Sequence, residues 1–230
     1  MIRLRDGDGV RTVTIDRPER RNALRPADLD DLRSAVVDAP TPVVYVHGAG
    51  DAFSAGADLD VVSSLDDPEA FARHGQDVLD AVESAESVVV AGVDGAARGG
   101  GVELALACDL RVATPDATFA ESGVRLGLFG AWGGTVRLPR VVGQADAFDL
   151  ALSGRVVDAQ EALRMGLVSR VVSDPATVAD ELTSNPADAL RSVKERLRDR
   201  SPAAEQEAAE ASTFAELHAA HADDVVAERE

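Results

Sequence analysis

The stretch "GVDGAARGGGVELALACDL", residues 92–110, joins three consecutive glycines to an apolar run that carries one carboxylate, Glu103. Glycine lets another part of the backbone approach closely, and the first turn of a helix leaves its N–H groups without intrahelical partners. Those N–H groups lie at the positive end of the helix dipole and suit an anion or an oxygen that becomes one. The stretch therefore predicts a helix whose N-terminus binds an oxygen of a ligand.

A second stretch repeats this plan. "VVYVHGAGDAFSAGADL" (43–59) and "VVVAGVDGAARGGGVEL" (88–104) each run from a Val-rich strand through a glycine turn and a small-residue loop to a helix start. A repeated strand–loop–helix unit indicates an α/β or α+β protein built from stacked units. Two N–H donors from separate loops can converge on one carbonyl oxygen, which is the arrangement of an oxyanion hole.

Glu103 lies one helical turn from the predicted donors. In an apolar pocket its pKa should rise, so that it could move a proton beside a polarised carbonyl. The plainer interpretation is a charge that is favourable at a helix N-terminus, and without the second loop we would prefer it. Ser54 lacks the G-x-S-x-G pattern of a nucleophile elbow, the histidines lack ligand-spaced partners, and no Walker lysine follows the glycines. We therefore expect neither a metal site nor a phosphate loop.

Composition narrows the class of protein further. Apolar residues make up 45% of the 230 residues and aromatic residues only 3%, so Ala and Val must fill the interior. No apolar run approaches the ~20 residues that span a bilayer, and the N-terminus lacks an apolar signal-peptide core. The single cysteine, Cys108, excludes an internal disulfide. These observations favour a cytoplasmic protein with no membrane partner.

The formal net charge is −18, and Lys194 is the only lysine. Such a surface repels nucleic acid and anionic membranes, so we expect no nucleic-acid partner. The acidic residues are spread along the whole chain, which favours a solvated surface over a patch for a cationic partner. Abundant Asp and Glu with almost no Lys suggests adaptation to salt.

Periodicity and capping signals predict strands at 11–16, 41–48 and 87–95, short strands within 109–121, and helices at 26–38 and 68–86. Asp158 and Glu161 form a capping-box-like pair, Gly166 ends that helix, and a strand follows at 167–172. From about residue 176 the chain is polar and helical. We expect a core that carries the site (1–172) and a C-terminal helical region for packing and oligomerisation (173–230).

Five segments, in order over about residues 11–172, resemble the enoyl-CoA hydratase/isomerase (crotonase) superfamily. They are "TIDRPERRNAL", "GAGDAFSAGADL", "GAARGGGVELALACDLRVA", "FAESGVRLGLFGAWGGTVRLPRVVG" and "LSGRVVDAQEALRMGLVSRVV". The resemblance implies a crotonase-type spiral of repeated ββα units with a C-terminal helical trimerisation region, assembled as trimers or dimers of trimers. It also implies a coenzyme A thioester as substrate, of the kind used in fatty acid metabolism, and no permanently bound cofactor.

The resemblance also assigns roles to residues of this chain. Ala57 and Gly100 match the two oxyanion N–H donors, and Glu103 matches the first of two catalytic glutamates. Arg20 and Arg21 fall where family members contact coenzyme A, although an exposed arginine is more often merely solvated. Phe129 and Trp132 are expected at the acyl pocket, or else in the core. The remaining substrate-binding residues that we expect are Ala23, Ala55, Gly56, Asp58, Leu59, Gly99 and Gly123.

The chain departs from the family at the second glutamate. Hydratases carry it in a stretch like "FGQPEIxLG", whereas this chain has "FAESGVRLG" and places Gly123 there. We expect the missing side chain to leave a larger pocket or an ordered water. Glu121 lies two residues earlier, and in an extended segment it would face the same way, so we name it as a further candidate catalytic residue, although it is not the aligned one. A glycine here also resembles the naphthoate-synthase branch, which lacks a glutamate matching Glu103.

Enoyl-CoA hydration is the leading prediction, with a metal-free site. Isomerisation, or another enolate reaction with a single acid–base group, is the alternative within the same family. A catalytically silent acyl-CoA-binding protein is the alternative outside enzymes. Retention of Glu103 argues against the silent protein, and loss of the second glutamate argues for it.

Overall fold

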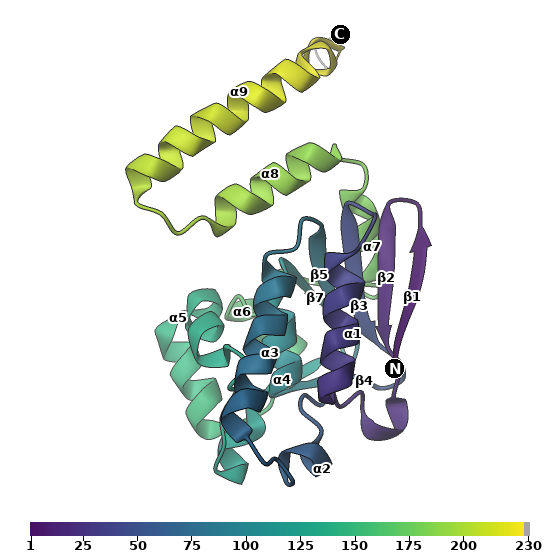
Figure 1. The fold of residues 1–230 in the computed structure, drawn as a ribbon, viewed down its shortest axis with the longest axis vertical. Coiled ribbons are helices and arrows are strands. Elements are labelled where there is room, and N and C mark those ends of the chain that lie inside the picture. The colour runs from purple at the N-terminus through teal and green to yellow at the C-terminus, as the bar shows by residue number, and fades with distance from the viewer. Residues whose placement is uncertain (228–230) are drawn as a thin grey trace. The chain divides into compact units, whose positions relative to one another are not determined.

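The fold was analysed in a computed structural model that describes residues 1–227 (Figure 1). The chain divides into two compact units, one spanning Met1–Thr183 and the other beginning at Ser184. The first unit contains all strands found among residues 1–227 and the two repeats recognised in the sequence, and it includes helix α7 (Ala176–Leu182).

The larger sheet of the first unit has six strands, in the order β1-β2-β3-β5-β7-β10. β1 and β2 form an antiparallel hairpin, and all later neighbours pair in parallel. Every residue of β5 is buried, as expected for a parallel strand that is covered on both faces. The strands are β1 (Ile2–Gly7), β2 (Val10–Ile15), β3 (Val43–Gly48), β5 (Val88–Val93), β7 (Leu110–Ala113) and β10 (Arg170–Val171).

The smaller sheet has four strands, in the order β4-β6-β8-β9. They are β4 (Ala52–Ser54), β6 (Ala96–Arg98), β8 (Thr118–Ala120) and β9 (Val157–Asp158). The chain alternates between the sheets: β3, β5 and β7 lie in the larger one, and β4, β6 and β8 follow them in the smaller one. Each turn of this spiral is a ββα unit, which confirms the predicted fold class.

Helices cover the sheets and place the loops. α1 (Pro26–Val37) and α3 (Pro68–Glu83) lie side by side over the larger sheet in Figure 1. Asp67 caps α3 by accepting a hydrogen bond from the N–H of Ala70 at 2.9 Å. The other helices of this unit are η1 (Pro18–Arg20), α2 (Leu59–Val62), α4 (Gly100–Ala107), η2 (Ser122–Leu126), α5 (Gly134–Ser153) and α6 (Ala159–Arg164).

Some elements differ from the sequence prediction. β4 and β6 lie in segments that we predicted as loops, and β1 and α5 were not predicted at all. Helix α5 escapes a periodicity search because Pro139 lies inside it and Gly143 has non-helical angles (φ 79°, ψ 166°). The segment after Glu121 is the 3₁₀ helix η2, not extended backbone, and Gly127 closes it in the left-handed region at φ 73°.

The second unit contains α8 (Ala187–Arg198) and α9 (Ala203–Ala227), so its described part is helical as predicted. His221 of α9 lies 2.9 Å from a carboxylate oxygen of Asp188 in α8. The role of this unit in oligomerisation remains a prediction.

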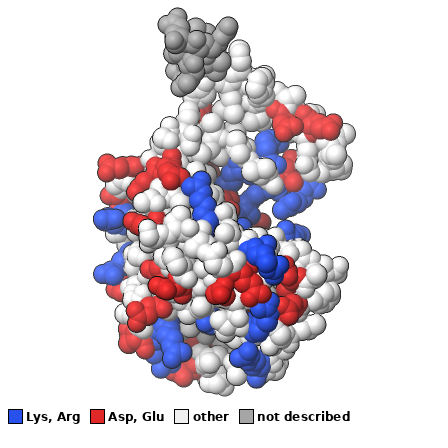
Figure 2. Space-filling view, turned by 180° about the vertical axis from the view of Figure 1, so that it is seen from behind, with Lys and Arg blue, Asp and Glu red and all other residues white. Residues whose placement is uncertain are grey.

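Two surface properties bear on the predicted partners. Acidic and basic side chains are interspersed over the face shown in Figure 2, in keeping with the predicted solvated surface. Among the described residues, no helix is both long enough and apolar enough to cross a membrane.

Candidate active site

The loops that end the two repeats meet backbone to backbone. Gly56 has φ +81°, and a Cβ added to it would lie only 2.6 Å from the backbone N of Gly100. The next residue, Ala57, and Gly100 itself therefore present neighbouring N–H groups. Within residues 1–227, neither N–H has a protein acceptor, because Gly100 is the first residue of α4 and Ala57 lies outside any helix. Two free donors are thus available to one ligand oxygen.

Side chains hold the first loop in place. Ser54 Oγ donates to the carbonyl of Asn22 at 2.9 Å and accepts from the N–H of Gly56 at 3.1 Å. Asn22 Nδ2 in turn donates to the carbonyl of Ala52 at 2.6 Å. The carbonyl of Gly56 accepts from the N–H of Leu24 at 2.7 Å. The loop that carries Ala57 is therefore fixed from both sides by buried hydrogen bonds.

Close packing holds the second loop. A Cβ on Gly100 would lie 2.4 Å from the Trp132 ring, and one on Gly101 would lie 2.2 Å from the carbonyl O of Ser54. Both distances are shorter than carbon side chains tolerate. The glycines are therefore required by contact with neighbouring groups, as the sequence predicted.

Glu103 is buried in the first turn of α4 and is only 2% exposed. Its Oε1 accepts hydrogen bonds from the N–H groups of Trp132 and Gly134, both at 2.7 Å. Its Oε2 is bonded to no donor in the described part of the chain. Burial raises the pKa of Glu103 to about 7, against the opposing effect of the two N–H groups and of the Arg137 charge. A carboxyl group with this pKa can both take and give a proton near neutral pH.

One cavity of about 800 Å³ contains the Ala57 and Gly100 donors and Glu103. All the site residues predicted from the sequence line it except Gly56, which lies behind the donors, and Glu121. Trp132 is buried at one wall, whereas Phe129 is 68% exposed. Part of the lining was not predicted from the sequence. It comes from η1, from α2, α3 and the loop between them, and from η2 and the segment after it: Glu19, Val62, Ser63, Leu65, Pro68, Phe71, Ala72, Ser122, Leu126, Leu128, Gly130 and Ala131. Apolar residues within short, irregular segments were the only available signal for them.

The two arginines expected to contact coenzyme A have different surroundings. Arg20 forms an ion pair with Asp60 and lies 3.5 Å from Asp58. Arg21 is exposed, lines the cavity and forms no ion pair within residues 1–227. Arg21 is therefore the arginine whose charge is available to a ligand phosphate.

Asp58 is held by the protein. Its Oδ2 accepts from Arg17 at 2.6 Å, and its Oδ1 accepts from the N–H of Asp60 at 3.0 Å, which caps α2. Burial alone would raise the pKa of Asp58, but these bonds, with the charges of Arg17 and Arg20, lower it overall. Although Asp58 borders the cavity, its carboxylate is occupied within the loop.

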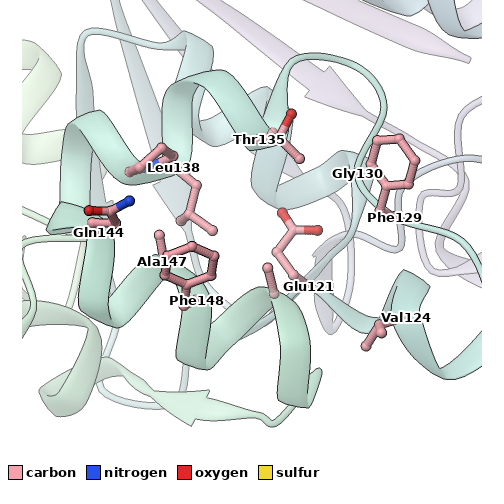
Figure 3. Close-up of a pocket in the computed structure, with 12 residues that line it drawn as sticks. Glu121, Val124, Phe129, Gly130, Thr135, Leu138, Gln144, Ala147 and Phe148 are labelled. Carbon is pink, nitrogen blue, oxygen red and sulfur yellow. The ribbon is translucent and has the colours of Figure 1, made fainter.

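Backbone lies close to the position of the second carboxylate. A Cβ on Gly123 would lie 3.1 Å from the Cα of Phe129 and 3.2 Å from its N, although Gly123 also lines the substrate cavity, so the larger pocket or ordered water at this position stays a prediction. Glu121 precedes η2 and is 6% exposed. It points into a separate, mainly apolar cavity of about 260 Å³ (Figure 3). Burial and the nearby Glu103 charge raise its pKa to about 9.

The fold and this site define a class of protein. The sequence profile described as enoyl-CoA hydratase/isomerase matches residues 5–226, so the chain belongs to that family and the resemblance noted above is confirmed. Among curated relatives, it is 39% identical over 179 residues to a Bacillus subtilis protein named "Probable enoyl-CoA hydratase", covering 75% of this chain and 69% of the relative.

Other relatives agree with this assignment. The "Crotonyl-CoA hydratase" of Syntrophomonas wolfei is 39% identical over 178 residues, covering 74% of this chain and 68% of the relative. Among solved structures, the enoyl-CoA hydratase of Thermoplasma volcanium superposes with a TM-score of 0.88 at 30% identity. That match covers 95% of this chain and 92% of the other.

Proposed function

We propose that this protein adds water to a 2-enoyl-CoA thioester. The observation that carries the proposal is the presence, in one cavity, of two unpartnered N–H donors and a buried carboxylate with a free oxygen. The relatives named as enoyl-CoA and crotonyl-CoA hydratases support the same reaction.

The chemistry follows from the positions of these groups. The thioester oxygen accepts hydrogen bonds from the N–H groups of Ala57 and Gly100, which stabilise the enolate as the double bond is attacked. Each such donor typically lowers the barrier by ~3–4 kcal/mol. Ionised Glu103 takes a proton from water while the water oxygen bonds to the β-carbon. The electron pair moves to the enolate, and the α-carbon then takes up a proton.

The two arginines at the cavity contribute unequally to binding of coenzyme A. Arg21 contacts a phosphate of coenzyme A, and Arg20 contributes less because Asp58 and Asp60 already neutralise it. The protein works in the cytoplasm, without a permanently bound cofactor or metal. It forms a homo-oligomer, a trimer or a dimer of trimers. Exposed apolar side chains on η2 and α5 support an assembly: Val124, Leu126, Phe148 and Leu152. The mass of the protein in solution tests this oligomeric state.

Isomerisation of the double bond is the second candidate. It needs only one acid–base group, and the backbone packed against Gly123 favours a site without a carboxylate at that position. In an isomerase, Glu103 would take a proton from one carbon of the acyl chain and return it to another.

An assay with crotonyl-CoA tests hydration directly. We expect loss of the enoyl-thioester absorbance and a 3-hydroxybutyryl-CoA product, with Glu103→Gln inactive. A 3-enoyl-CoA substrate that is converted to the 2-enoyl isomer, with no hydrated product from crotonyl-CoA, would replace hydration by isomerisation. Binding of both thioesters without turnover would identify a silent acyl-CoA-binding protein.

A further inference from the structure

Glu121 is a buried carboxyl group without a partner. It is 6% exposed, and neither Oε1 nor Oε2 has a hydrogen-bond partner in the described part of the chain. Its cavity is lined mainly by apolar side chains of α5, among them Leu138, Ala147 and Phe148 (Figure 3). Leaving such a group unsatisfied costs free energy, and the fold would be better served by an apolar residue of similar shape.

The position of Glu121 relative to Glu103 points to a use. A Cβ placed on Gly130 would lie 3.0 Å from Glu103 Cδ and 3.0 Å from Glu121 Oε2. The two carboxyl groups therefore approach the same point beside Gly130, and no side chain separates them there. Gly130 and Phe129 line both cavities, so this gap lies where the Glu121 cavity borders the substrate cavity.

Position 123 cannot supply a carboxylate without a rearrangement. A Cβ there already meets the backbone of Leu128 and Phe129 at 3.1–3.3 Å, and a longer side chain would require that segment to shift. This chain therefore lacks a carboxylate at the position of the family's second glutamate. It carries an unpartnered carboxyl group, Glu121, two residues earlier.

We propose that Glu121 is the second acid–base group of this active site and gives its proton to the α-carbon of the substrate enolate. The proposal rests on the proposed function in requiring an acyl-CoA enolate, but not on water being the nucleophile.

The protons balance in the hydration cycle. Glu103 takes a proton from water as the oxygen bonds to the β-carbon, and Glu121 releases its proton to the α-carbon. At that point Glu103 is neutral and Glu121 is anionic, and transfer of one proton from Glu103 to Glu121 restores the starting state.

Electrostatics favour this direction of transfer. Two charges act on the pair. The charge of Glu103, on α4, raises the pKa of Glu121, and the charge of Arg137, on α5, lowers the pKa of Glu103. The pKa of Glu121, raised to about 9, exceeds that of Glu103, raised to about 7. At neutral pH Glu121 therefore keeps its proton while Glu103 ionises, and the restoring transfer runs downhill.

Exchange of the α-protons of butyryl-CoA in D₂O near pH 9, where about half of Glu121 is ionised and can accept the α-proton, tests the proposal, because it requires only enolate formation. In this saturated thioester, the group that protonates the enolate is also the one that removes the α-proton. Glu121→Gln keeps the shape of the side chain and breaks no protein hydrogen bond. We expect exchange and hydration to fall by about 10²-fold or more, with the dissociation constant of butyryl-CoA nearly unchanged. Glu121→Asp should recover part of the exchange, and Glu181→Gln, on the exposed face of α7, is the matched control.

The dependence of kcat on pH distinguishes a catalytic role of Glu121 from a merely structural one, because a structural role would not change its shape. Wild-type kcat should decline at alkaline pH as Glu121 loses its proton, and Glu121→Gln should lose that decline along with most of its rate. Glu121→Gln protein that binds butyryl-CoA normally and exchanges at the wild-type rate would overturn the proposal. Wild-type protein that exchanges but does not hydrate would refute the proposed function alone, and the loss of exchange in Glu121→Gln would still support Glu121. Wild-type protein that does neither would refute both.

Discussion

Asp58 and Glu103 each precede a leucine at the end of a strand–loop–helix repeat, and each is 2% exposed. Both follow a backbone N–H that is offered to the ligand. Asp58 faces Arg17 and Arg20, which come from η1 and the residue before it, outside the repeat. Glu103 accepts hydrogen bonds from backbone N–H groups instead of arginines, and the positive charge that acts on it is that of Arg137.

The difference shows how one repeated unit yields two kinds of carboxylate. Burial favours the neutral form at both positions, but the arginines outweigh it at Asp58 and lower its pKa. At Glu103 burial prevails and the pKa rises to about 7. Repetition therefore supplies the pair of N–H donors, whereas residues from outside the repeat decide which carboxylate is fixed and which remains reactive.

Removing the reactive carboxylate should give the largest effect on catalysis. We expect Glu103→Gln to lower kcat by about 10²–10⁴-fold, since the site loses its proton acceptor. The dissociation constant of an acyl-CoA should change little, because both N–H donors remain. Steady-state kinetics with crotonyl-CoA and calorimetric titration with butyryl-CoA measure the two quantities. A loss of less than tenfold in kcat would contradict the acid–base role.

Removing the fixed carboxylate should act on stability instead. Asp58→Ala removes the buried carboxylate partner of Arg17 and the cap of α2, and we expect the free energy of unfolding to fall by about 1.5–3 kcal/mol. Urea denaturation measures this change, with Asp60→Ala as a control for the exposed partner of Arg20. An unchanged urea midpoint would show that the ion pair with Arg17 contributes nothing to stability.

The sequence predicted the parts of the site that depend on local chemistry. The glycine loops and the cost of burying a carboxylate predicted two helix-start loops with Glu103 beside them, and the repeat predicted stacked strand–loop–helix units, whereas Ala57 and Gly100 were identified through the resemblance to the family. The surroundings of Glu121 could not be predicted, because they depend on η2 replacing an extended segment and on Gly130 leaving space from a distant loop. Arg20, which lies opposite Asp58, was expected to contact coenzyme A, since no local signal shows which acid lies beside an arginine in the fold.

A buried carboxyl group with a raised pKa and one with a lowered pKa should change the stability of the fold in opposite ways as the pH changes, and Glu121 and Asp58 are such a pair. The pKa of Glu121 rises from its ordinary 4.5 to about 9, so the unfolded chain loses this proton first as the pH rises. The folded state is therefore destabilised between those pH values, by no more than about 1.5 kcal/mol per pH unit. We expect the melting temperature of Glu121→Gln to exceed that of wild type by a margin that grows as the pH is raised from roughly 5 to 8.5, which lies between the two pKa values.

Asp58 has a lowered pKa, so its contribution is present above its unfolded pKa and is lost in acid. The melting-temperature gap between wild type and Asp58→Ala should therefore narrow as the pH falls through the acid range. Thermal melts of the three proteins over one pH series check both trends. A constant gap between wild type and Glu121→Gln would contradict the raised pKa.

Added salt should have the smallest effect on stability, and this effect should arise from the whole surface of the protein instead of one site. With a net charge of −18, repulsion among exposed acids destabilises the fold, and added KCl screens it. We expect the melting temperature to rise from low to molar KCl, in parallel for wild type and Asp58→Ala, because the buried pair is screened far less than the surface. A flat or falling melting temperature would exclude salt adaptation.

Trp132 is the only tryptophan in the chain, and its place gives the protein an optical property. The indole ring packs where side chains are missing at Gly75 and Gly100. The backbone N–H of Trp132 donates to Glu103, and its backbone carbonyl accepts from Arg137 at 3.0 Å. All indole fluorescence of the protein therefore originates at the wall of the substrate cavity. We therefore expect emission from this one ring to change when a ligand enters the cavity or Glu103 ionises, in the unlabelled protein and without a coupled reaction or an attached dye.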